Sequence, residues 1–423
     1  MSVKMKNKLV SGLALTFTLG SFNALATNGY FTHGYGMTHK GMAGAGVALS
    51  EELMSGANNP ASFNVNDTEI SVGLELFSPD RKYTASSVDT FYPNALYLEA
   101  KTQKSDNTLF AIPEFAIGHQ LNDKINIGLL VYGNGGMNTD YNAESEPEGT
   151  FYAGTTGVDL KQMFISPTIN YQLNEQTKVG VSPIYVVQQF KATGLGNFAP
   201  FSQSPQALTN NGTDTSTGLG VQVGVTQTVG TSFSWGASYR SSVAMEEFDS
   251  YKGLFAEDGG FDLPSSIQIG AAYKITPNNQ LVFDWQKINY SEVKSIANPI
   301  SNLMSAPLGA SAGAGFGWED MDIYKLGYQW QRTAKQKIRF GVSYTQQPIP
   351  SSEVLFNILA PGVQEWHFTT GFSHRVNEKV LLNAMAFYSP AKKVSGANFL
   401  APNQQLSIEM QQSGVGVSIV WGI

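Results

Sequence analysis

Residues 324–331 read YKLGYQWQ, and bulky apolar side chains alternate with polar or small ones along this stretch. Four bulky residues fall on one face of an extended chain: Tyr324, Leu326, Tyr328 and Trp330. A period of two is the period of a β-strand, in which successive side chains point to opposite faces of the sheet. The pattern therefore predicts a strand with one face in an apolar medium and the other toward a polar or small-residue interior.

The same alternation recurs along the chain, for example at residues 267–274, 338–345 and 414–421. We count about fourteen such segments. They are predicted to begin near Thr68, Asn107, Lys124, Val158, Gln176, Thr217, Ser232, Pro264, Asn278, Glu319, Lys335, Val363, Lys379 and Ser407. An even number of strands suits a closed antiparallel barrel with both ends of the chain on one side.

The connections between these segments fall into two classes. Short polar turns are expected at residues 121–123, 174–176, 229–231, 276–279, 332–334 and 376–378. Longer pieces lie between them, at residues 141–157, 194–216, 295–317 and 348–362. In outer-membrane barrels the short turns face the periplasm and the long loops face the exterior. A soluble β-sandwich or propeller is the alternative, but it would leave the apolar strand faces in water, and the chain has no repeat of fixed period.

Composition supports a membrane barrel. The chain has 423 residues, no cysteine, 12% aromatic residues and only 14% charged residues, against a usual charged share of about 25%. No apolar run after residue 26 is long enough for a membrane helix. The sequence predicts an all-β fold, a 14-stranded antiparallel transmembrane β-barrel in the cell outer membrane of a Gram-negative bacterium.

Residues 1–26 have the pattern of a secretory signal peptide. Lys4, Lys6 and Lys8 precede a short apolar core at residues 9–20, and residues 24–26 read ALA, a cleavage signal. An uncleaved anchor is the alternative. Loss of the three lysines takes the net charge from −7 to −10, which argues against nucleic acid as a partner.

Residues 27–63 are unlike the rest of the chain. They read TNGYFTHGYGMTHKGMAGAGVALSEELMSGANNPASF, with neither strand alternation nor a long helical period. Because a barrel of about fourteen strands is wide enough to need filling, we predict that this stretch is a plug of short helices inside the lumen. The predicted domains are the hatch at residues 27–66 and the barrel at residues 67–423. Ser50 is expected to cap a short helix over residues 51–54 that ends at Gly56.

Several pieces of this sequence resemble the FadL/TodX-like outer-membrane transporters. The hatch run at residues 41–48 (GMAGAGVA) is followed by Asn59-Pro60-Ala61 and then by a strand. Further pieces in the family's order are residues 159–161, 170–174, 239–241, 263–264 and 347–350. The resemblance covers the mature chain and implies a 14-stranded barrel, closed by an N-terminal hatch, that takes up long-chain fatty acids or aromatic hydrocarbons.

The resemblance also implies a route for the ligand. Outer loops capture it, a site touching the hatch receives it, and it leaves sideways where the third strand is kinked. The third strand is expected at residues 124–137. Gly128 and the glycine-rich piece at residues 134–136 are its predicted weak points, because glycine inside a strand often marks a bulge or bend. The alternative is that these glycines end the strand at a turn. That alternative is favoured for residues 134–136, which leaves Gly128 as the predicted kink.

No catalytic or metal-binding pattern stands out. The chain has no cysteine, and the spacing of its five histidines matches no common metal motif. It also lacks the G-x-S-x-G elbow of serine hydrolases. The sequence therefore predicts a protein that is not an enzyme and that carries no metal or cofactor, although a barrel phospholipase or protease stays open as an alternative.

Two groups of residues are candidates for the ligand site. The predicted hatch contacts are Phe31, Tyr35, Met37, Met42, Leu53, Met54, Asn59, Pro60, Ala61 and Phe63; the alternative is that they only pack the plug against the wall. Alternation turns four cations toward the lumen, namely Arg240, Lys274, Lys325 and Arg339. Arg240, Lys325 and Arg339 are the candidate partners for a fatty-acid carboxylate, unless they pair with interior acids such as Asp284 or Glu75.

The sequence thus predicts passive uptake of hydrophobic small molecules, with long-chain fatty acids first and neutral or aromatic hydrocarbons as the alternative. Residues 317–320 read GWED where many family members carry a lysine, and this departure favours the neutral ligand. A structural or adhesive barrel without transport is the alternative of another class, and a polar porin is a further one. The expected partners are a hydrophobic ligand, outer-membrane lipid and the barrel-assembly machinery.

Overall fold

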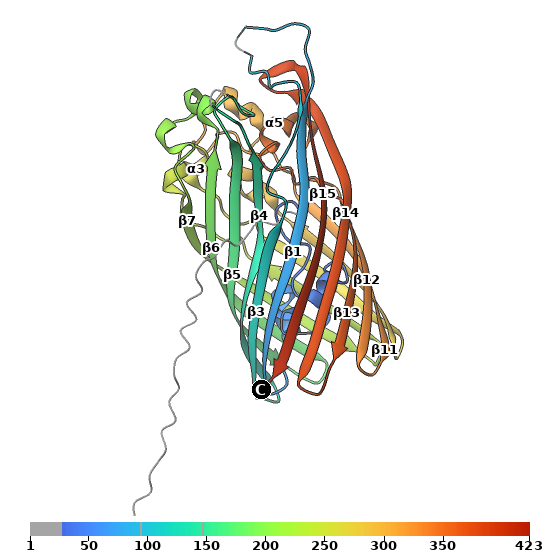
Figure 1. Ribbon diagram of the computed structural model, residues 1–423. Helices are drawn as coiled ribbons and strands as arrows, with labels where there is room; N and C mark the ends of the chain where they lie inside the picture. The colour runs from blue at the N-terminus through green and yellow to red at the C-terminus, as the bar shows by residue number, and fades with distance from the viewer. Residues whose placement is uncertain (1–27, 94, 146–147) are drawn as a thin grey trace, which may run out of the picture.

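A computed structural model describes residues 28–93, 95–145 and 148–423. Fourteen antiparallel strands form a closed barrel, because β15 pairs with β1 as well as with β14 (Figure 1). The barrel strands are β1 (Thr68–Ala85), β3 (Phe110–Asn122), β4 (Ile125–Tyr141), β5 (Thr156–Gln172), β6 (Thr177–Thr193), β7 (Asp214–Val229), β8 (Phe233–Arg240), β9 (Ser266–Thr276), β10 (Asn279–Ile288), β11 (Met321–Thr333), β12 (Gln336–Thr345), β13 (Trp366–Arg375), β14 (Val380–Asn398) and β15 (Ala401–Gly422). The short β2 (Thr102–Lys104) pairs with β1 alone. The predicted 14-stranded barrel is confirmed, and the largest error in a strand start is at β15, which begins at Ala401 rather than near Ser407.

The alternation of side chains determines which face of each strand meets the membrane. On β11, Leu326 is 47% exposed and Tyr324 is 48% exposed, whereas Lys325 between them is 2% exposed. The bulky residues therefore point outward, and the polar or small ones point into the lumen. Within the described residues no helix has the length and apolar character to cross a membrane. The predicted signal segment lies outside the described residues.

The two ends of the barrel differ. Short turns join the strands at the end where the chain terminates, and long loops gather at the other end (Figure 1). Short helices in these outer loops are η2 (Gly196–Phe201), η3 (Pro205–Ala207), η4 (Asp249–Tyr251), α3 (Ala256–Gly259), η5 (Tyr290–Glu292), α4 (Lys294–Ala297), η6 (Ile300–Met304), η7 (Ser351–Glu353) and α5 (Val354–Asn357). The loops thus form a compact cover over the lumen.

The hatch, residues 28–66 in the described chain, lies inside the barrel. Its helices are α1 (Met37–Lys40), α2 (Ser55–Asn58) and η1 (Pro60–Ser62). The predicted helix over residues 51–54 is wrong, since α2 begins at Ser55. The hydroxyl of Ser55 accepts hydrogen bonds from the backbone N–H groups of Glu51 and Glu52, which holds the preceding residues in a turn.

Strand β4 is irregular at residues 134–136, one of its two predicted weak points, and not at Gly128, the predicted kink. The β3–β4 and β4–β5 ladders both run without a register shift through Gly128, so the predicted kink there is wrong. The shift lies between Gly133 and Gly135, which makes Asn134 an extra residue in the strand. The interpretation of residues 134–136 as the strand end is also wrong, because β4 continues to Tyr141.

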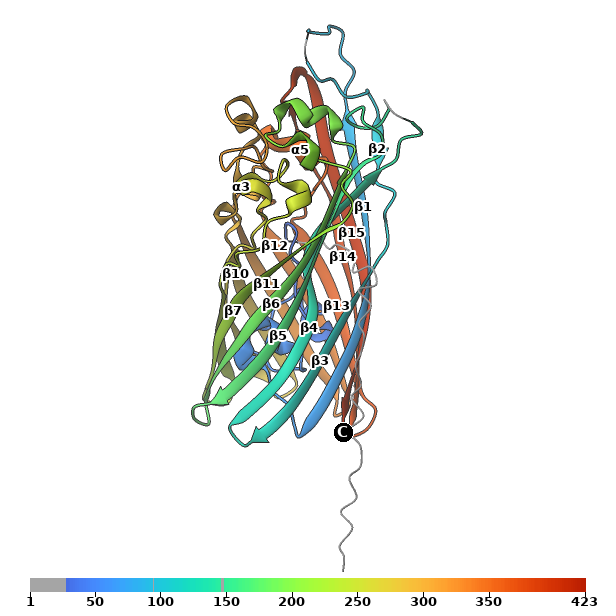
Figure 2. The ribbon, with the colours of Figure 1, turned by 90° about the vertical axis from the view of Figure 1, so that its left-hand side faces the viewer.

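At this irregularity β4 changes its neighbour. The β3–β4 ladder stops at the pair Glu114 and Tyr132 (Figure 2). Beyond it the hatch takes the place of β3: Thr32 N donates to Asn134 O, and Gly136 N donates to Tyr30 O, both at 2.9 Å. The hatch backbone therefore pairs with β4 where β3 has left it, and further along the strand Asp106 N donates to Asp140 O.

Luminal glycines let the hatch approach the wall backbone. A Cβ added at Gly341 on β12 would lie 2.2 Å from the carbonyl carbon of Met42, and one added at Gly180 on β6 would lie 2.2 Å from that of Pro60. Neither neighbour is the end of a flexible side chain, so only glycine fits at these two positions. Hatch and wall therefore pack without intervening side chains.

The substitution Gly341→Ala tests this packing. Because the new Cβ meets hatch backbone, we expect the hatch to shift and small polar solutes to pass more rapidly than through the wild type, measured by liposome swelling. Gly422→Ala is the matched control, since its Cβ would have no non-neighbouring heavy atom closer than 3.7 Å. Equal swelling rates for both variants would contradict the close contact.

Candidate ligand site

An apolar hollow lies among the outer loops. Its empty volume, including the part open to solvent, is about 540 Å³. Five loops and the end of β6 contribute phenylalanine rings to its lining: Phe151, Phe190, Phe198, Phe255, Phe316 and Phe356. Such a lining suits an apolar molecule and offers little to a polar one.

A cluster of aromatic rings connects this hollow with the hatch. The ring of Phe255 packs on Phe261 at 4.8 Å between centroids, and Phe261 lies 6.0 Å from Tyr30 of the hatch. Tyr290 and Trp318 complete the contact with Tyr30 at 5.3 Å and 6.1 Å. The apolar surface therefore continues from the outer loops to the first residues of the hatch.

Arg240, the last residue of β8, lies at the inner end of this surface and is 4% exposed. Its Nη1 donates to the Tyr35 hydroxyl at 3.0 Å and to Asn134 Oδ1 at 2.9 Å. The guanidinium carbon sits 4.7 Å from the centre of the Phe31 ring and 5.2 Å from that of Phe164. Among the described residues, no carboxylate forms an ion pair with Arg240.

A small polar cavity opens beside Arg240, with an empty volume of about 280 Å³. Besides Arg240 and Tyr35, its polar lining includes Asn58, Gln222, Ser238, Ser266, Gln268 and Gln286. Neutral amides and hydroxyls surround the one cation. A buried cation in such a setting favours an anionic partner from outside the chain.

The other predicted luminal cations are engaged by the protein itself. Lys325 Nζ donates to the carbonyl oxygens of His33 and Gly44, and its cross-strand neighbour is Asp284. Lys274 is exposed and lines a polar depression at the short-turn end of the barrel. Neither residue lines the cavity next to Arg240.

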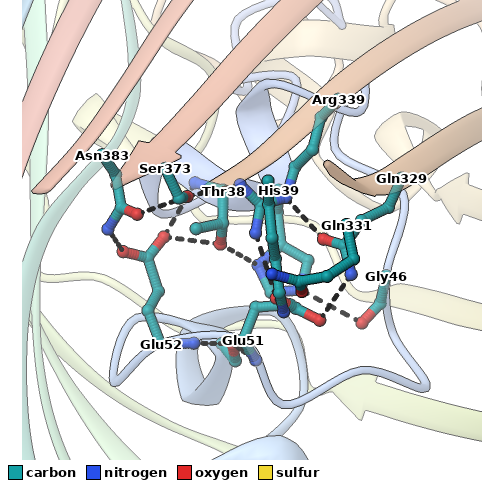
Figure 3. A network of polar contacts seen from close by, with 12 residues as sticks. Thr38, His39, Gly46, Glu51, Glu52, Gln329, Gln331, Arg339, Ser373 and Asn383 are labelled. Atoms are coloured by element: carbon teal, nitrogen blue, oxygen red, sulfur yellow. Dashed lines mark hydrogen bonds and ion pairs between the residues drawn. The ribbon is translucent and has the colours of Figure 1, made fainter. Parts of the chain in front are cut away.

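Arg339 pairs with Glu51 of the hatch (Figure 3), and Lys337 completes this ion-pair anchor. The Glu51 carboxylate of the hatch lies 3.0 Å from Arg339 Nη2 and 2.6 Å from Lys337 Nζ, both on β12. Burial would raise the pKa of Glu51, but the two cations outweigh burial and hold that pKa well below its usual range. Arg339 therefore binds the hatch, which leaves Arg240 as the candidate carboxylate partner.

A second ion pair joins the hatch to β1, four strands away from β12 in the barrel. Lys40 of α1 pairs with Glu75 of β1, and both side chains are buried. Glu52 accepts hydrogen bonds from the N–H and hydroxyl of Thr38 and from Asn383 of β14 (Figure 3). Burial raises the pKa of Glu52. Charged contacts thus fix the middle of the hatch to the wall.

The predicted hatch contacts do not form one site. Phe31 and Met37 belong to the large core that includes the outer loops, Met42 packs in a small separate cluster, and a third cluster holds four other predicted residues: Tyr35, Leu53, Met54 and Phe63. Asn59 caps η1, and Pro60 and Ala61 lie in that turn. Phe31 and Tyr35 are the two that contact Arg240.

Sequence reasoning missed Asn134 and three aromatic residues at the inner end of the site, Tyr30, Tyr290 and Trp318. Trp318 lies in the GWED piece at residues 317–320, where the ring is buried and its Nε1 donates to Asn357. Asp320 in the same piece accepts from Ser291 N and pairs with Lys287 at 3.5 Å. Residues 28–35 are rich in aromatic residues, which could have pointed to Tyr30. Nothing in the sequence indicated that these residues would contact the outer loops.

The histidines and acids of the described residues were compared with the needs of a metal site. Among the described residues, no three His, Cys, Asp or Glu side chains are grouped so that they could hold a metal ion. His33 and His367 stack with ring centroids 5.6 Å apart, next to Phe387. They form part of the packing between hatch and wall.

The barrel, its internal plug and the apolar path define the class of outer-membrane transport proteins. A family model described as outer membrane protein transport protein (OMPP1/FadL/TodX) matches residues 18–420. The chain belongs to this family, whose members carry hydrophobic substrates through the outer membrane of Gram-negative bacteria.

Individual relatives are distant. The chain is 22% identical to the long-chain fatty acid transport protein of Escherichia coli O6:H1, over 92% of each chain. Among solved structures, a Pseudomonas aeruginosa FadL homologue matches with a TM-score of 0.70 at 14% identity, covering 93% of this chain and 99% of that one. The Pseudomonas putida toluene transporter TodX matches with a TM-score of 0.67 at 14% identity and the same coverage. These likenesses establish the shared fold.

Replacing Glu51 with Gln tests the ion-pair anchor. The change leaves Arg339 buried without its carboxylate, and losing one partner of a buried pair costs about 3–5 kcal/mol. Because Lys337 is partly exposed, the lower end is expected here. We predict a lower unfolding temperature in detergent and faster entry of small polar solutes. Glu365→Gln is the control, because it breaks a more exposed pair with Lys392. It should change neither the unfolding temperature nor the rate at which small polar solutes enter.

The anchor also predicts a pH dependence. The pKa of Glu51 is lower in the folded protein than in the unfolded chain, so its stabilising contribution is present above the unfolded value of about 4.3 and is lost as the pH falls toward the folded value. The difference in unfolding temperature between the wild type and Glu51→Gln is therefore expected to be constant from about pH 7 to 5 and to shrink below about pH 4. A difference that grows on acidification would contradict this assignment.

Proposed function

We propose that this protein takes up long-chain fatty acids across the outer membrane by passive diffusion, with Arg240 as the partner of the ligand carboxylate. The observation that carries the proposal is that Arg240 is buried without an ion pair to any described carboxylate, whereas Arg339 is paired with Glu51. Burying an unpaired cation is costly. A carboxylate ligand would complete the pair, which supports an acidic rather than a neutral ligand.

The apolar surface supports binding of the hydrocarbon tail. Each buried methylene contributes about 0.8 kcal/mol, so ten methylenes contribute about 8 kcal/mol before the cost of association. Six phenylalanines line the outer hollow, and the rings around Tyr30 continue that surface to Arg240. The proposed path therefore begins in the outer hollow and ends with the head group at Arg240.

Release is proposed to occur sideways through the seam between β3 and β4. The ladder between these strands stops at Glu114 and Tyr132. Just above that point hatch residues 30 and 32 hydrogen-bond to the edge of β4 that faces β3, and further along Asp106 N donates to Asp140 O. Phe31 of this segment touches Arg240 directly. Movement of three residues would join the ligand site to the bilayer, whereas an exit through the bottom would require movement of the anchored part of the hatch.

A neutral hydrocarbon is the second candidate. The hollow is lined almost wholly by apolar atoms, and the GWED piece at residues 317–320 offers acids instead of a lysine near the outer loops. The solved relatives include a toluene transporter. For such a ligand the same path would serve, and Arg240 would have no role in binding.

Binding of palmitate, methyl palmitate and hexadecane to the protein in nanodiscs separates the two candidates. For Arg240→Gln we expect about 10- to 100-fold weaker binding of palmitate, the value of a hydrogen bond to a charged group, with little change for the other two. Lys325→Gln is the control variant and should keep the preference for the acid. Growth on palmitate, in a Gram-negative host strain without its own transporter, should fall with Arg240→Gln only.

Tight binding of hexadecane with no response to Arg240→Gln would replace the fatty-acid proposal with hydrocarbon uptake. If none of the three probes bound, and the protein failed to restore growth on palmitate or on an alkane, transport of apolar molecules would be refuted. A structural or adhesive barrel would then account for the fold.

A further inference from the structure

We propose that the outward face of four strands, β14, β15, β1 and β2, binds the phosphorylated sugar head group of one lipopolysaccharide molecule. The site lies above the apolar band of the barrel and is separate from the ligand path through the lumen. Two rows of side chains cross the four strands there: a charged row (Lys393, Glu409, Lys82 and Lys104) and a hydroxyl row (Ser395, Ser407, Thr84 and Thr102).

The apolar outer face of these strands stops before the long-loop end of the barrel. Strands β14, β15 and β1 run side by side toward that end (Figure 1), and β2 adds to the edge of β1 there. Leu76 and Val415, which pair across β1 and β15, are 41% and 54% exposed. Beyond them the outward positions of both strands are polar: Ser78, Asp80, Lys82, Thr84, Ser413, Gln411, Glu409 and Ser407. The wall therefore leaves the hydrocarbon region at Leu76 and Val415.

The height of the charged row distinguishes between two kinds of lipid head group. Lys82 and Glu409 lie six residues beyond Leu76 and Val415 along their strands. At about 3.3 Å per residue and a strand tilt of about 40°, they stand about 15 Å above the apolar edge. A phospholipid head group extends only about 5–8 Å beyond the hydrocarbon core. The outer leaflet of a Gram-negative outer membrane consists of lipopolysaccharide, whose phosphorylated sugars reach further, so the height favours that lipid.

The charged row has more cations than acids. Lys393 of β14 stands opposite Glu409 of β15, which stands opposite Lys82 of β1, and Lys82 stands opposite Lys104 of β2. Lys82 Nζ lies 2.9 Å from Glu409, and Lys104 Nζ lies 3.1 Å from Asp80, two residues before Lys82. Lys393 forms no ion pair with a described residue. The row is therefore suited to an anion from outside the chain.

Two of the lysines face each other directly. Lys82 and Lys104 are cross-strand partners in the β1–β2 ladder, and like charges directly opposite one another destabilise a sheet. Glu409 and Asp80 relieve this repulsion only in part, because both ion pairs are partly exposed and exposed pairs contribute little. A phosphate bound between the two ammonium groups would offset the repulsion, and lysine is a common partner of phosphate.

The hydroxyl row suits the sugar part of the head group. It crosses the same four strands, two residues beyond the charged row on β14, β15 and β1. The hydroxyl oxygens of Thr84 and Thr102 lie 2.8 Å apart, and Thr102 is exposed. Because a hydroxyl can donate one hydrogen bond and accept two, these groups retain capacity to bind sugar hydroxyls. The short side chains leave room for a sugar ring next to the lysines.

The combined substitution Lys82→Gln, Lys104→Gln and Lys393→Gln tests the site. The probe is rough lipopolysaccharide with a phosphorylated inner core, added to the full-length protein in detergent and counted by native mass spectrometry. EDTA is present so that divalent cations do not bridge lipid and protein. The wild type should retain one molecule. The variant should bind about 10- to 100-fold more weakly, because each lysine near an anionic lipid surface contributes a factor of about five.

Two further variants sharpen the test. Lys124→Gln combined with Lys335→Gln and Lys379→Gln is the matched control, because it removes three exposed lysines at the short-turn end of the barrel. It should bind the lipid as the wild type does. Glu409→Gln frees Lys82 from its ion pair and should strengthen binding. Unchanged gel mobility on heating verifies that each variant barrel is folded.

Two further probes test the chemistry of the head group. Dephosphorylated lipopolysaccharide and phosphatidylglycerol should bind the wild type more weakly, with little response to loss of the three lysines. Equal affinity of the wild type and the triple variant for the phosphorylated lipid, or an equal loss in the matched control, would refute the site. Phosphatidylglycerol that binds as tightly and with the same dependence on the lysines would also overturn the proposal, because a phospholipid would then be the occupant.

Discussion

Backbone groups in a bilayer need hydrogen-bond partners. Neighbouring strands supply most of them in this barrel, but at the seam between β3 and β4 the hatch supplies some. Along most of the barrel the wall strands pair with one another, but just beyond Tyr132 the edge of β4 that faces β3 hydrogen-bonds to residues 30–32 of the hatch. An unsatisfied N–H or C=O in hydrocarbon costs several kcal/mol. The plug is therefore part of the wall, and a barrel without it would have an open edge in the membrane.

Charged contacts are distributed unevenly along the hatch. Two ion-pair contacts fix its middle part, Lys40 with Glu75 of β1 and Glu51 with the cations of β12. β1 lies next to β3, and β12 lies four strands further round the barrel. The first hatch residues and Asn134 are held instead by amides, a phenol and aromatic rings, with Arg240 as the cation that contacts them. The charged contacts therefore hold the middle of the hatch, and mostly neutral contacts hold its first residues.

The barrel could be predicted from the sequence because the alternation of side chains is a property of each strand by itself. Alternation at residues such as Tyr324 and Lys325 follows from a strand with lipid on one side and a polar lumen on the other, and it needs no knowledge of neighbouring strands. The position of the irregularity in β4 could not be predicted from this local alternation. Gly128 and the glycines around Asn134 carry the same local signal, and only the register of β4 against β5 shows which of them adds a residue.

The roles of the residues in the candidate site could not be predicted from local sequence either. Arg240, Lys325 and Arg339 look alike in the sequence, since each lies at a luminal position of a strand. Their roles differ because Glu51 of the hatch reaches Arg339 and hatch carbonyls reach Lys325, whereas no described carboxylate reaches Arg240. Contacts across more than 280 residues of chain make that distinction. A chain of the same pattern with an acid near Arg240 would keep the barrel and the apolar path, yet lose the reason to prefer an acidic ligand. The choice between fatty acids and hydrocarbons therefore lies in very few side chains around a shared path.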